Sequence, residues 1–199
     1  MIVLKKILKK ISKQLLITCL PTAFLLLSGA CSVKQYYPAP GTITEDRFAL
    51  VRADSLLVAV RPQAYQGSYQ EINSRFFPVL IRIKNSSTQK VQLRKGSFGI
   101  IAQGKQFDPI PTELILANMR QNHLLQTYED PFTILEDDDY SLNRTSDEDQ
   151  YYEVIYNSFS YGELLPGGMK EGYLFYHDRV SQADGFSIDI LGTTVNFEK

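Results

Sequence analysis

Short segments in which apolar and polar residues alternate constrain the fold of this chain more than any other feature of its sequence. In residues 77–85 (FPVLIRIKN), the side chains of Val79, Ile81 and Ile83 fall on one side of an extended backbone, and residues 186–191 (FSIDIL) alternate in the same way. Successive side chains of a strand point to opposite faces, so this period of two predicts half-buried β-strands.

Further strands are predicted where β-branched or aromatic runs lie between turn residues, at 56–61, 91–94, 98–102, 106–110, 172–177 and 194–198. The intervening turns are expected at 85–87, 103–105, 165–168 and 191–193. Short strands separated by turns in this way predict an antiparallel β-sandwich, a fold class that is mainly β.

The first thirty residues have a different character. Five lysines and no acidic residue occupy the first thirteen positions, and the apolar run 15–27 follows. This run is short for a membrane span, because a membrane-spanning helix needs about 20 apolar residues. Pro21 also interrupts the run. The small residues Ser28, Gly29 and Ala30 come next, which is typical of a secretory signal peptide covering residues 1–30.

Residues 27–31 (LSGAC) resemble the lipobox of bacterial lipoproteins, with Ser28 where leucine is usual. The resemblance implies cleavage before Cys31, a diacylglycerol on its sulfur and acylation, for example by palmitate, of the new amino terminus. Several acyl chains hold a protein firmly, because each buried methylene contributes about 0.8 kcal/mol. An ordinary cleaved signal with an incidental cysteine is the alternative, and Cys19 is a poorer lipid site.

The residue after the cysteine bears on location. In Gram-negative lipoproteins an aspartate there favours retention in the inner membrane, so Ser32 implies the outer membrane, facing the periplasm or the cell surface. This expectation assumes a Gram-negative host.

Charge and cysteine content limit the remaining chain. Of the 21 basic residues five lie in the leader, which leaves sixteen against 22 acidic residues and a net charge of −6. Such a domain is a poor general binder of nucleic acid. With Cys19 in the leader and Cys31 on the lipid, no disulfide is expected.

After Cys31 the sequence predicts three parts. Residues 31–47, with two prolines and a glycine, are expected to form a lipidated tether, and residues 48–199 a single sandwich domain. Residues 111–161 interrupt this domain with a predicted helix at 111–128, an acidic loop at 130–150 and a second helix at 151–160. One face of the second helix carries an aromatic stripe that we expect to be packed: Tyr152, Ile155, Tyr156 and Phe159.

A second resemblance concerns the fold. Residues 78–107 (PVLIRIKNSSTQKVQLRKGSFGIIAQGKQF), with Leu165-Pro166-Gly167 and residues 172–175 (GYLF), are similar to immunoglobulin-like domains of unknown function on bacterial lipoproteins. The resemblance covers about half of the chain after Cys31, and the insertion 111–161 departs from the compact pattern. It implies an immunoglobulin-like sandwich, and such a fold does not by itself give a function.

Catalytic patterns are not evident in the sequence. His123 and His177 occur without metal-ligand spacing, and there is no nucleophile elbow, no free cysteine after Cys31 and no glycine-rich phosphate loop. We therefore expect no enzyme and no cofactor.

Residues 137–148 are the best metal candidate. Five residues occupy the ligand positions of a twelve-residue calcium loop: Asp137, Asp139, Ser141, Asn143 and Glu148. Leu142 replaces the glycine that such a loop needs at its sixth position, and Arg144 replaces an apolar residue. A solvated acidic loop without metal is the preferred interpretation.

These features favour a membrane-anchored, non-enzymatic module for protein interaction or assembly, whose envelope partner the sequence does not identify. We expect the contact surface on the insertion, which is rich in tyrosine: Tyr128, Tyr140, Tyr151, Tyr152 and Tyr156. Packing of these tyrosines onto the sandwich is an equal alternative. A ligand- or calcium-binding protein using residues 111–161 is the second hypothesis, and a hydrolase with dispersed carboxylates the third.

Overall fold

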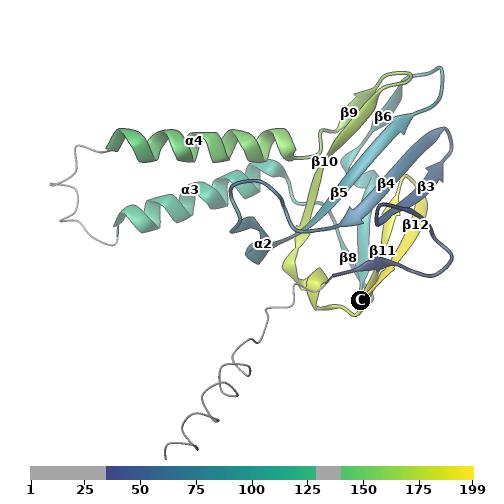
Figure 1. The fold of residues 1–199 in the computed structure, drawn as a ribbon, viewed down its shortest axis with the longest axis horizontal. Coiled ribbons are helices and arrows are strands. Elements are labelled where there is room, and N and C mark those ends of the chain that lie inside the picture. Colours follow the sequence, from purple (N-terminus) through teal and green to yellow (C-terminus); the bar gives the residue numbers. More distant parts are fainter. Residues whose placement is uncertain (1–34, 129–139) are drawn as a thin grey trace, which may run out of the picture. The chain divides into compact units, whose positions relative to one another are not determined.

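The computed structural model describes residues 35–128 and 140–199, with side chains for 35–120 and 148–199. Twelve strands form two five-stranded sheets and one small sheet within these residues, and every strand pair is antiparallel. The chain is therefore mainly β, as the sequence predicts (Figure 1).

Sheet A contains, in spatial order, β1 (Tyr37–Pro38), β12 (Thr193–Glu198), β11 (Gly185–Ile190), β7 (Phe98–Ala102) and β8 (Lys105–Phe107). Sheet B contains β10 (Met169–His177), β5 (Phe76–Asn85), β4 (Leu56–Pro62), β3 (Phe48–Ala53) and β2 (Ile43–Glu45). Sheet C pairs β6 (Val91–Leu93) with β9 (Gly162–Leu164). The helical segments are α2 (Ile72–Arg75), η1 (Lys95–Ser97), α3 (Thr112–Tyr128), α4 (Tyr140–Asn157) and η3 (Asp178–Gln182).

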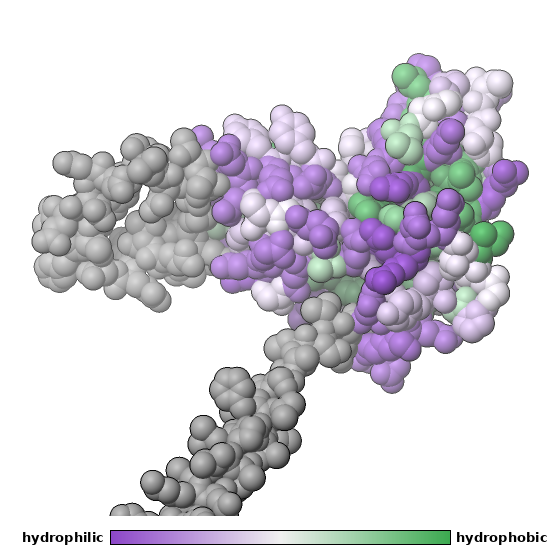
Figure 2. Space-filling model, viewed as in Figure 1, coloured by the Kyte–Doolittle hydropathy of each residue, from purple (hydrophilic) through white to green (hydrophobic). Residues whose placement is uncertain are grey.

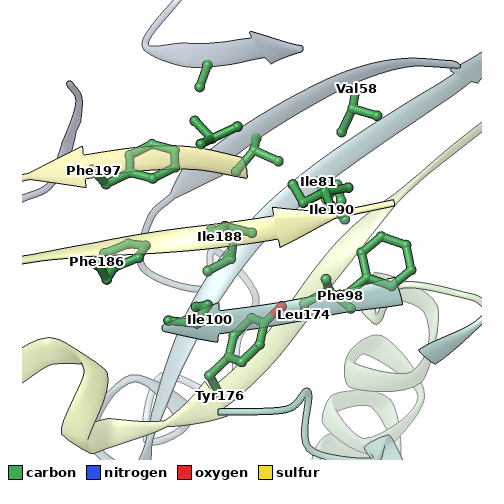
Figure 3. Close-up of a cluster of buried hydrophobic side chains, with 14 of the residues drawn as sticks. Val58, Ile81, Phe98, Ile100, Leu174, Tyr176, Phe186, Ile188, Ile190 and Phe197 are labelled. Carbon is green, nitrogen blue, oxygen red and sulfur yellow. The ribbon is translucent and has the colours of Figure 1, made fainter. Parts of the chain in front are cut away.

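Sheets A and B pack face to face through one apolar core, which defines a sandwich. The alternating residues that the sequence places on one side of each strand lie in this core, including Ile81 and Ile83 from β5 and Ile188 and Ile190 from β11. Figure 3 shows side chains of both sheets pointing toward one another, with Phe98 and Phe197 from sheet A and Val58 from sheet B. The period of two in the sequence is thus confirmed as the inner faces of a sandwich.

A second apolar core lies on the opposite face of sheet B. Side chains of β5 and β10, among them Leu80, Tyr173 and Phe175, pack there against α2, α3, α4 and the loop after β4. This cover explains why residues 172–176 form an unbroken buried run, since both faces of that part of β10 are packed. The described residues from 35 onward form three main layers: sheet A, sheet B and the helices.

Two-residue turns connect several of the strands. Leu191 and Gly192 both have positive φ angles, of 54° and 81°, between Ile190 and Thr193, which pair across the turn. Gln103 and Gly104 join β7 to β8 in the same way. Two consecutive positive φ angles match the twist of a tight hairpin, and both turns confirm the sequence predictions.

The tether is shorter than the sequence predicts. β1 and β2 lie within residues 31–47, and Tyr36 is only 4% exposed in the main core. This segment pairs with the last strand of the chain, a long-range contact that local composition does not reveal. The folded part therefore begins at Tyr36 at the latest.

The helices of the insertion also differ from expectation. α3 agrees with the predicted helix at 111–128, but α4 begins at Tyr140, inside the predicted acidic loop, and ends at Asn157. Polar and acidic residues are compatible with a solvated helix, and packing of its C-terminal half onto sheet B adds stability that composition does not show. β3, β9 and the short helix α2 were not predicted.

Candidate interaction surface

The C-terminal half of α4 is held against sheet B by one buried side. Val154 is fully buried in the second core beside Ile115 and Met119 of α3. Tyr151 is half-buried, and its hydroxyl accepts a hydrogen bond from Nη2 of Arg120 at 3.1 Å. The guanidinium of Arg120 also lies 5.0 Å from the centre of the Tyr151 ring, so α3 and α4 are joined by apolar and cation–π contacts.

The end of α4 is fixed to β10 by a backbone hydrogen bond. The amide of Ser158 donates to the carbonyl of Val154 in the last turn of the helix at 3.0 Å, and the amide of Phe159 donates to the carbonyl of Tyr173 in β10 at 2.9 Å. Asn157 adds a side-chain hydrogen bond to the hydroxyl of Tyr65 at 3.1 Å. These bonds leave little freedom for the last turn of the helix to rotate.

Glu153 connects α4 to the loop that follows β4. Its carboxylate accepts hydrogen bonds from the amide of Ser68, at 2.8 Å, and from the Ser68 hydroxyl. The loop carries Tyr65 and Tyr69 into the second core. The packed side of α4 is therefore the side that carries Tyr151, Glu153 and Val154.

The other side of α4 exposes large side chains. Tyr152 is 54% exposed, Ile155 39% and Tyr156 81%. Residues three and four positions apart are neighbours on a helix, so these three form one continuous stripe. Glu148 and Asp149 are exposed one turn earlier, and Asp149 is three residues before Tyr152. We call these five residues the α4 surface.

The prediction that this aromatic stripe is packed is wrong for three of its four members. Only Phe159 is buried, while Tyr152, Ile155 and Tyr156 are exposed. The helix ends at Asn157, so Phe159 no longer follows the helical period and enters the core from an extended segment. The period alone therefore selected the wrong side of the helix.

The other tyrosines of the insertion fall into two groups. Tyr151 packs against α3, so it is not available as part of an open surface. Tyr128 and Tyr140 belong to α3 and α4, but their side chains lie outside the described ones. Of the predicted contact tyrosines, Tyr152 and Tyr156 are thus the two that the structure places at the surface.

A second exposed patch lies on sheet B beyond the helices. Leu57 and Met169 are both exposed and flank Lys84 in one row across β4, β5 and β10. In the next row, Nε of Arg82 lies 2.7 Å from a carboxylate oxygen of Glu171, and this hydrogen bond raises the pKa of Arg82. Figure 2 shows apolar surface gathered over the strands between polar groups, whereas the visible side of the helical pair is mostly pale to hydrophilic.

The structure bears on only part of the calcium candidate. Ser141, Asn143 and Glu148 lie in α4, whereas Asp137 and Asp139 fall outside the described residues. These three positions belong to a helix, whereas the ligands of the predicted twelve-residue site would come from a loop. Within the described residues, no three His, Cys, Asp or Glu side chains are grouped to hold a metal ion.

The two histidines are not brought together as a site. His177 ends β10 at the surface, and its Nδ1 accepts a hydrogen bond from the amide of Arg179 at 3.2 Å. It therefore caps η3, which is a structural use of the side chain. The side chain of His123 lies outside the described ones.

Two phenols, the buried Tyr176 and the half-buried Tyr161, are the most perturbed titratable groups in the described part of the chain. Burial raises the pKa of Tyr161 to about 12, and it raises the pKa of Tyr176 further. The Tyr176 hydroxyl has no hydrogen-bond partner among the described residues. Both rings belong to or pack on the main core, so the shifts follow from packing.

The predicted signal peptide and the predicted lipid attachment residue, Cys31, lie outside the described residues. In the described part, no helix has the length and apolar character needed to cross a membrane.

Comparison with known proteins gives no relative. The chain matches no family model, no curated protein and no solved structure.

Proposed function

We propose that this chain is a lipid-anchored, non-enzymatic envelope protein that binds a protein partner through the α4 surface. The observation that carries the proposal is the exposure of Tyr152, Ile155 and Tyr156 on one side of a helix whose other side is packed. Tyrosine is enriched at protein interfaces because its ring offers apolar area and its hydroxyl offers a hydrogen bond.

The rigidity of α4 supports the same proposal. Its last turns are held by Val154 in the core and by hydrogen bonds from Asn157 and Phe159. A preformed surface loses little side-chain and backbone freedom on binding, so more of the contact energy appears as affinity.

The envelope location rests on the lipobox-like residues 27–31, with the lipid on Cys31. Ser32 favours the outer membrane if the host is Gram-negative. The non-enzymatic character is proposed because the sequence offers no recognisable nucleophile, metal or phosphate motif.

We interpret the sandwich as immunoglobulin-like. Its strands β4, β5 and β10 lie side by side in sheet B, and β7, β11 and β12 lie side by side in sheet A. This order resembles the arrangement of strands A, B and E opposite strands C, F and G in immunoglobulin domains. Such sandwiches occur as interaction modules, and the fold likeness alone gives no function.

Site-specific crosslinking in the native envelope tests the docking surface. A photoreactive amino acid replaces Tyr156 in one variant and Ile101 in the control. Ile101 is 50% exposed on β7 of sheet A and matches Tyr156 as a large exposed apolar side chain. The proposal expects one dominant protein adduct from position 156 and none, or only diffuse adducts, from position 101.

A paired substitution gives the complementary measurement. Tyr152→Ser with Tyr156→Ser should remove the adduct formed by a crosslinker at Ile155, while Ile101→Ser leaves it in place. An adduct that persists in the double variant, or that forms equally well from position 101, contradicts docking through α4.

Metabolic labelling tests the anchor separately. Cys31→Ala should abolish palmitate incorporation and move the processed protein out of the membrane fraction, while Cys19→Ala should change neither. Retained labelling in Cys31→Ala would show that the lipid is elsewhere.

A further inference from the structure

Tyr36 fixes the start of the folded domain. Its ring is 4% exposed and meets Phe77 and Phe186 edge-on, with ring centres 5.6 and 4.9 Å away. Its hydroxyl lies 2.8 Å from the carbonyl oxygen of Ala183 and 3.0 Å from that of Ser181. The chain is therefore held at this residue by contacts with both sheets and with η3.

The distance along the chain from Cys31 to Tyr36 is short. Four residues separate them, and an extended chain spans at most about 3.6 Å per residue, so the two Cα atoms lie within ~18 Å of each other. A long flexible tether of 31–47, as the sequence suggests, would have permitted several times that reach.

The sandwich has two ends that can be told apart by strand pairing. At the end with Tyr36, β1 meets the close of β12, and η3 joins β10 to β11. We call this the proximal end. The distal end carries the turns at 86–89, 165–168 and 191–192, where β5, β10 and β11 lie farthest from Tyr36.

The length of the sandwich exceeds the reach of the tether. β5 alone has ten residues, and at about 3.4 Å per residue it extends ~34 Å from the proximal to the distal end. A lipid on Cys31 therefore leaves the proximal end near the bilayer, whereas the distal end can reach the bilayer only if the whole domain lies on its side.

We propose that the proximal end, formed by Tyr37, η3 and Lys199, faces the lipid surface at close range. This inference rests on the proposed lipid at Cys31 and adds an orientation to it. Tyr37 is 48% exposed there. A tyrosine whose hydroxyl contacts water suits the boundary between water and membrane.

The charges at the proximal end do not attract the domain to the membrane. Two basic residues, Arg179 and Lys199, lie there with three acidic ones, Asp178, Asp184 and Glu198, so this end has no excess of positive charge. The contact with lipid follows from the short tether, and the unlipidated domain is expected not to bind vesicles.

Fluorescence quenching in vesicles tests the orientation with the full chain. A single cysteine replaces Gln182 at the proximal end or Thr88 at the distal end, both of which are exposed. The lipidated protein, labelled there with a fluorophore, is reconstituted into phosphatidylethanolamine–phosphatidylglycerol vesicles that contain lipids with a quencher on the headgroup. The chain without an added cysteine reports background labelling, and palmitate incorporation is measured on each preparation.

The proposal expects quenching at position 182 to exceed that at position 88 by about twofold or more, given their separation of roughly 30 Å along the strands. Inserting about 20 Gly and Ser residues after Lys34 adds a root-mean-square length of ~25 Å and should remove most of this difference. Equal or reversed quenching in a palmitate-labelled protein overturns the orientation and leaves the anchor standing. A difference that survives the insertion overturns the tether argument. Failure of palmitate labelling overturns both the anchor and the orientation.

Discussion

The hydroxyl of Tyr36 donates a hydrogen bond to the carbonyl oxygen of Ala183, 2.8 Å away and 147 positions later in the chain. The carbonyl oxygens of Ser181 and Val180 lie at 3.0 and 3.3 Å from the same hydroxyl. This bond ties the first described residues to the segment between η3 and β11. It closes the main core at its proximal end.

Replacing Tyr36 by phenylalanine should lower the free energy of unfolding by about 1–2 kcal/mol, because the buried carbonyl of Ala183 loses its side-chain donor. Chemical denaturation of the protein beginning at Lys34 measures the change. Tyr37→Phe is the matched control, since the Tyr37 hydroxyl bonds only Gln35 at the surface in the described structure. Equal effects of the two substitutions would argue against a special role of the Tyr36 hydroxyl.

The residue at which a truncated protein begins should also affect its melting temperature. A protein comprising residues 46–199 lacks β1, β2 and Tyr36, whereas one comprising 34–199 retains them. Both should show spectra rich in β-structure and be indifferent to reducing agent, but the shorter one should melt at a clearly lower temperature because Phe77 and Phe186 lose a packed ring. Identical melting would indicate that residues 35–45 contribute nothing to stability.

Gly172→Ala should destabilise the protein by about 1–3 kcal/mol through overpacking. A Cβ atom at Gly172 would lie 2.7 Å from the backbone nitrogen and Cα of Phe159, too close for the segment that follows α4. Gly99→Ala on β7 is the control, because the nearest atom to its new Cβ is the side-chain nitrogen of Gln106 at 4.0 Å. Similar melting temperatures for the two variants would contradict the close approach of β10 and residue 159.

Stability should fall in alkaline solution as buried tyrosines ionise. An unfolded phenol loses its proton near pH 10, whereas burial raises the pKa of Tyr161 to about 12. Between these values the folded state holds more protons than the unfolded state, so the free energy of unfolding decreases as pH rises from 10 toward 12. Denaturation midpoints measured across this range should fall less steeply for Tyr161→Phe than for the unchanged protein. A variant with an unchanged slope would contradict the burial of this phenol.

Calcium should have little effect on the melting temperature. An ion stabilises a protein by RT ln(1 + [L]/Kd), so a weak site contributes little at millimolar calcium. Three of the five candidate ligands lie on a helix rather than a loop. A clear rise in melting temperature that is lost in Asp137→Ala would instead favour the calcium-binding alternative.

Most of the strand layout could be predicted from the sequence. The alternation at Val79, Ile81 and Ile83 and the turn at Leu191 and Gly192 both agree with the structure. Period-two patterns and turn residues act over a few positions, so they are visible without knowledge of the fold. Four strands, β1, β2, β3 and β9, were missed because their sequences lack a strong alternation. β9 has only three residues, and β1 and β2 are short edge strands.

The side of α4 that faces water was decided by tertiary structure. Tyr152, Ile155 and Tyr156 have the same helical spacing that a packed face would show, and composition favours burial of such residues. Val154 and Tyr151 occupy the contact with sheet B instead, because α3 and the segment after Asn157 fix the rotation of the helix.

The sequence by itself determined that a β-sandwich would form and that a helical insertion would interrupt it, because local periodicity specifies which residues each strand can bury. Only the tertiary structure decided that Tyr36 belongs to the core and that the aromatic stripe of α4 stays exposed. Both depend on which distant segment occupies the available apolar surface: residues 180–183 and Phe186 enclose Tyr36, while α3 and β10 pack against the opposite side of α4, at Tyr151 and Val154. The local spacing of apolar residues does not reveal which of these distant segments will occupy the surface.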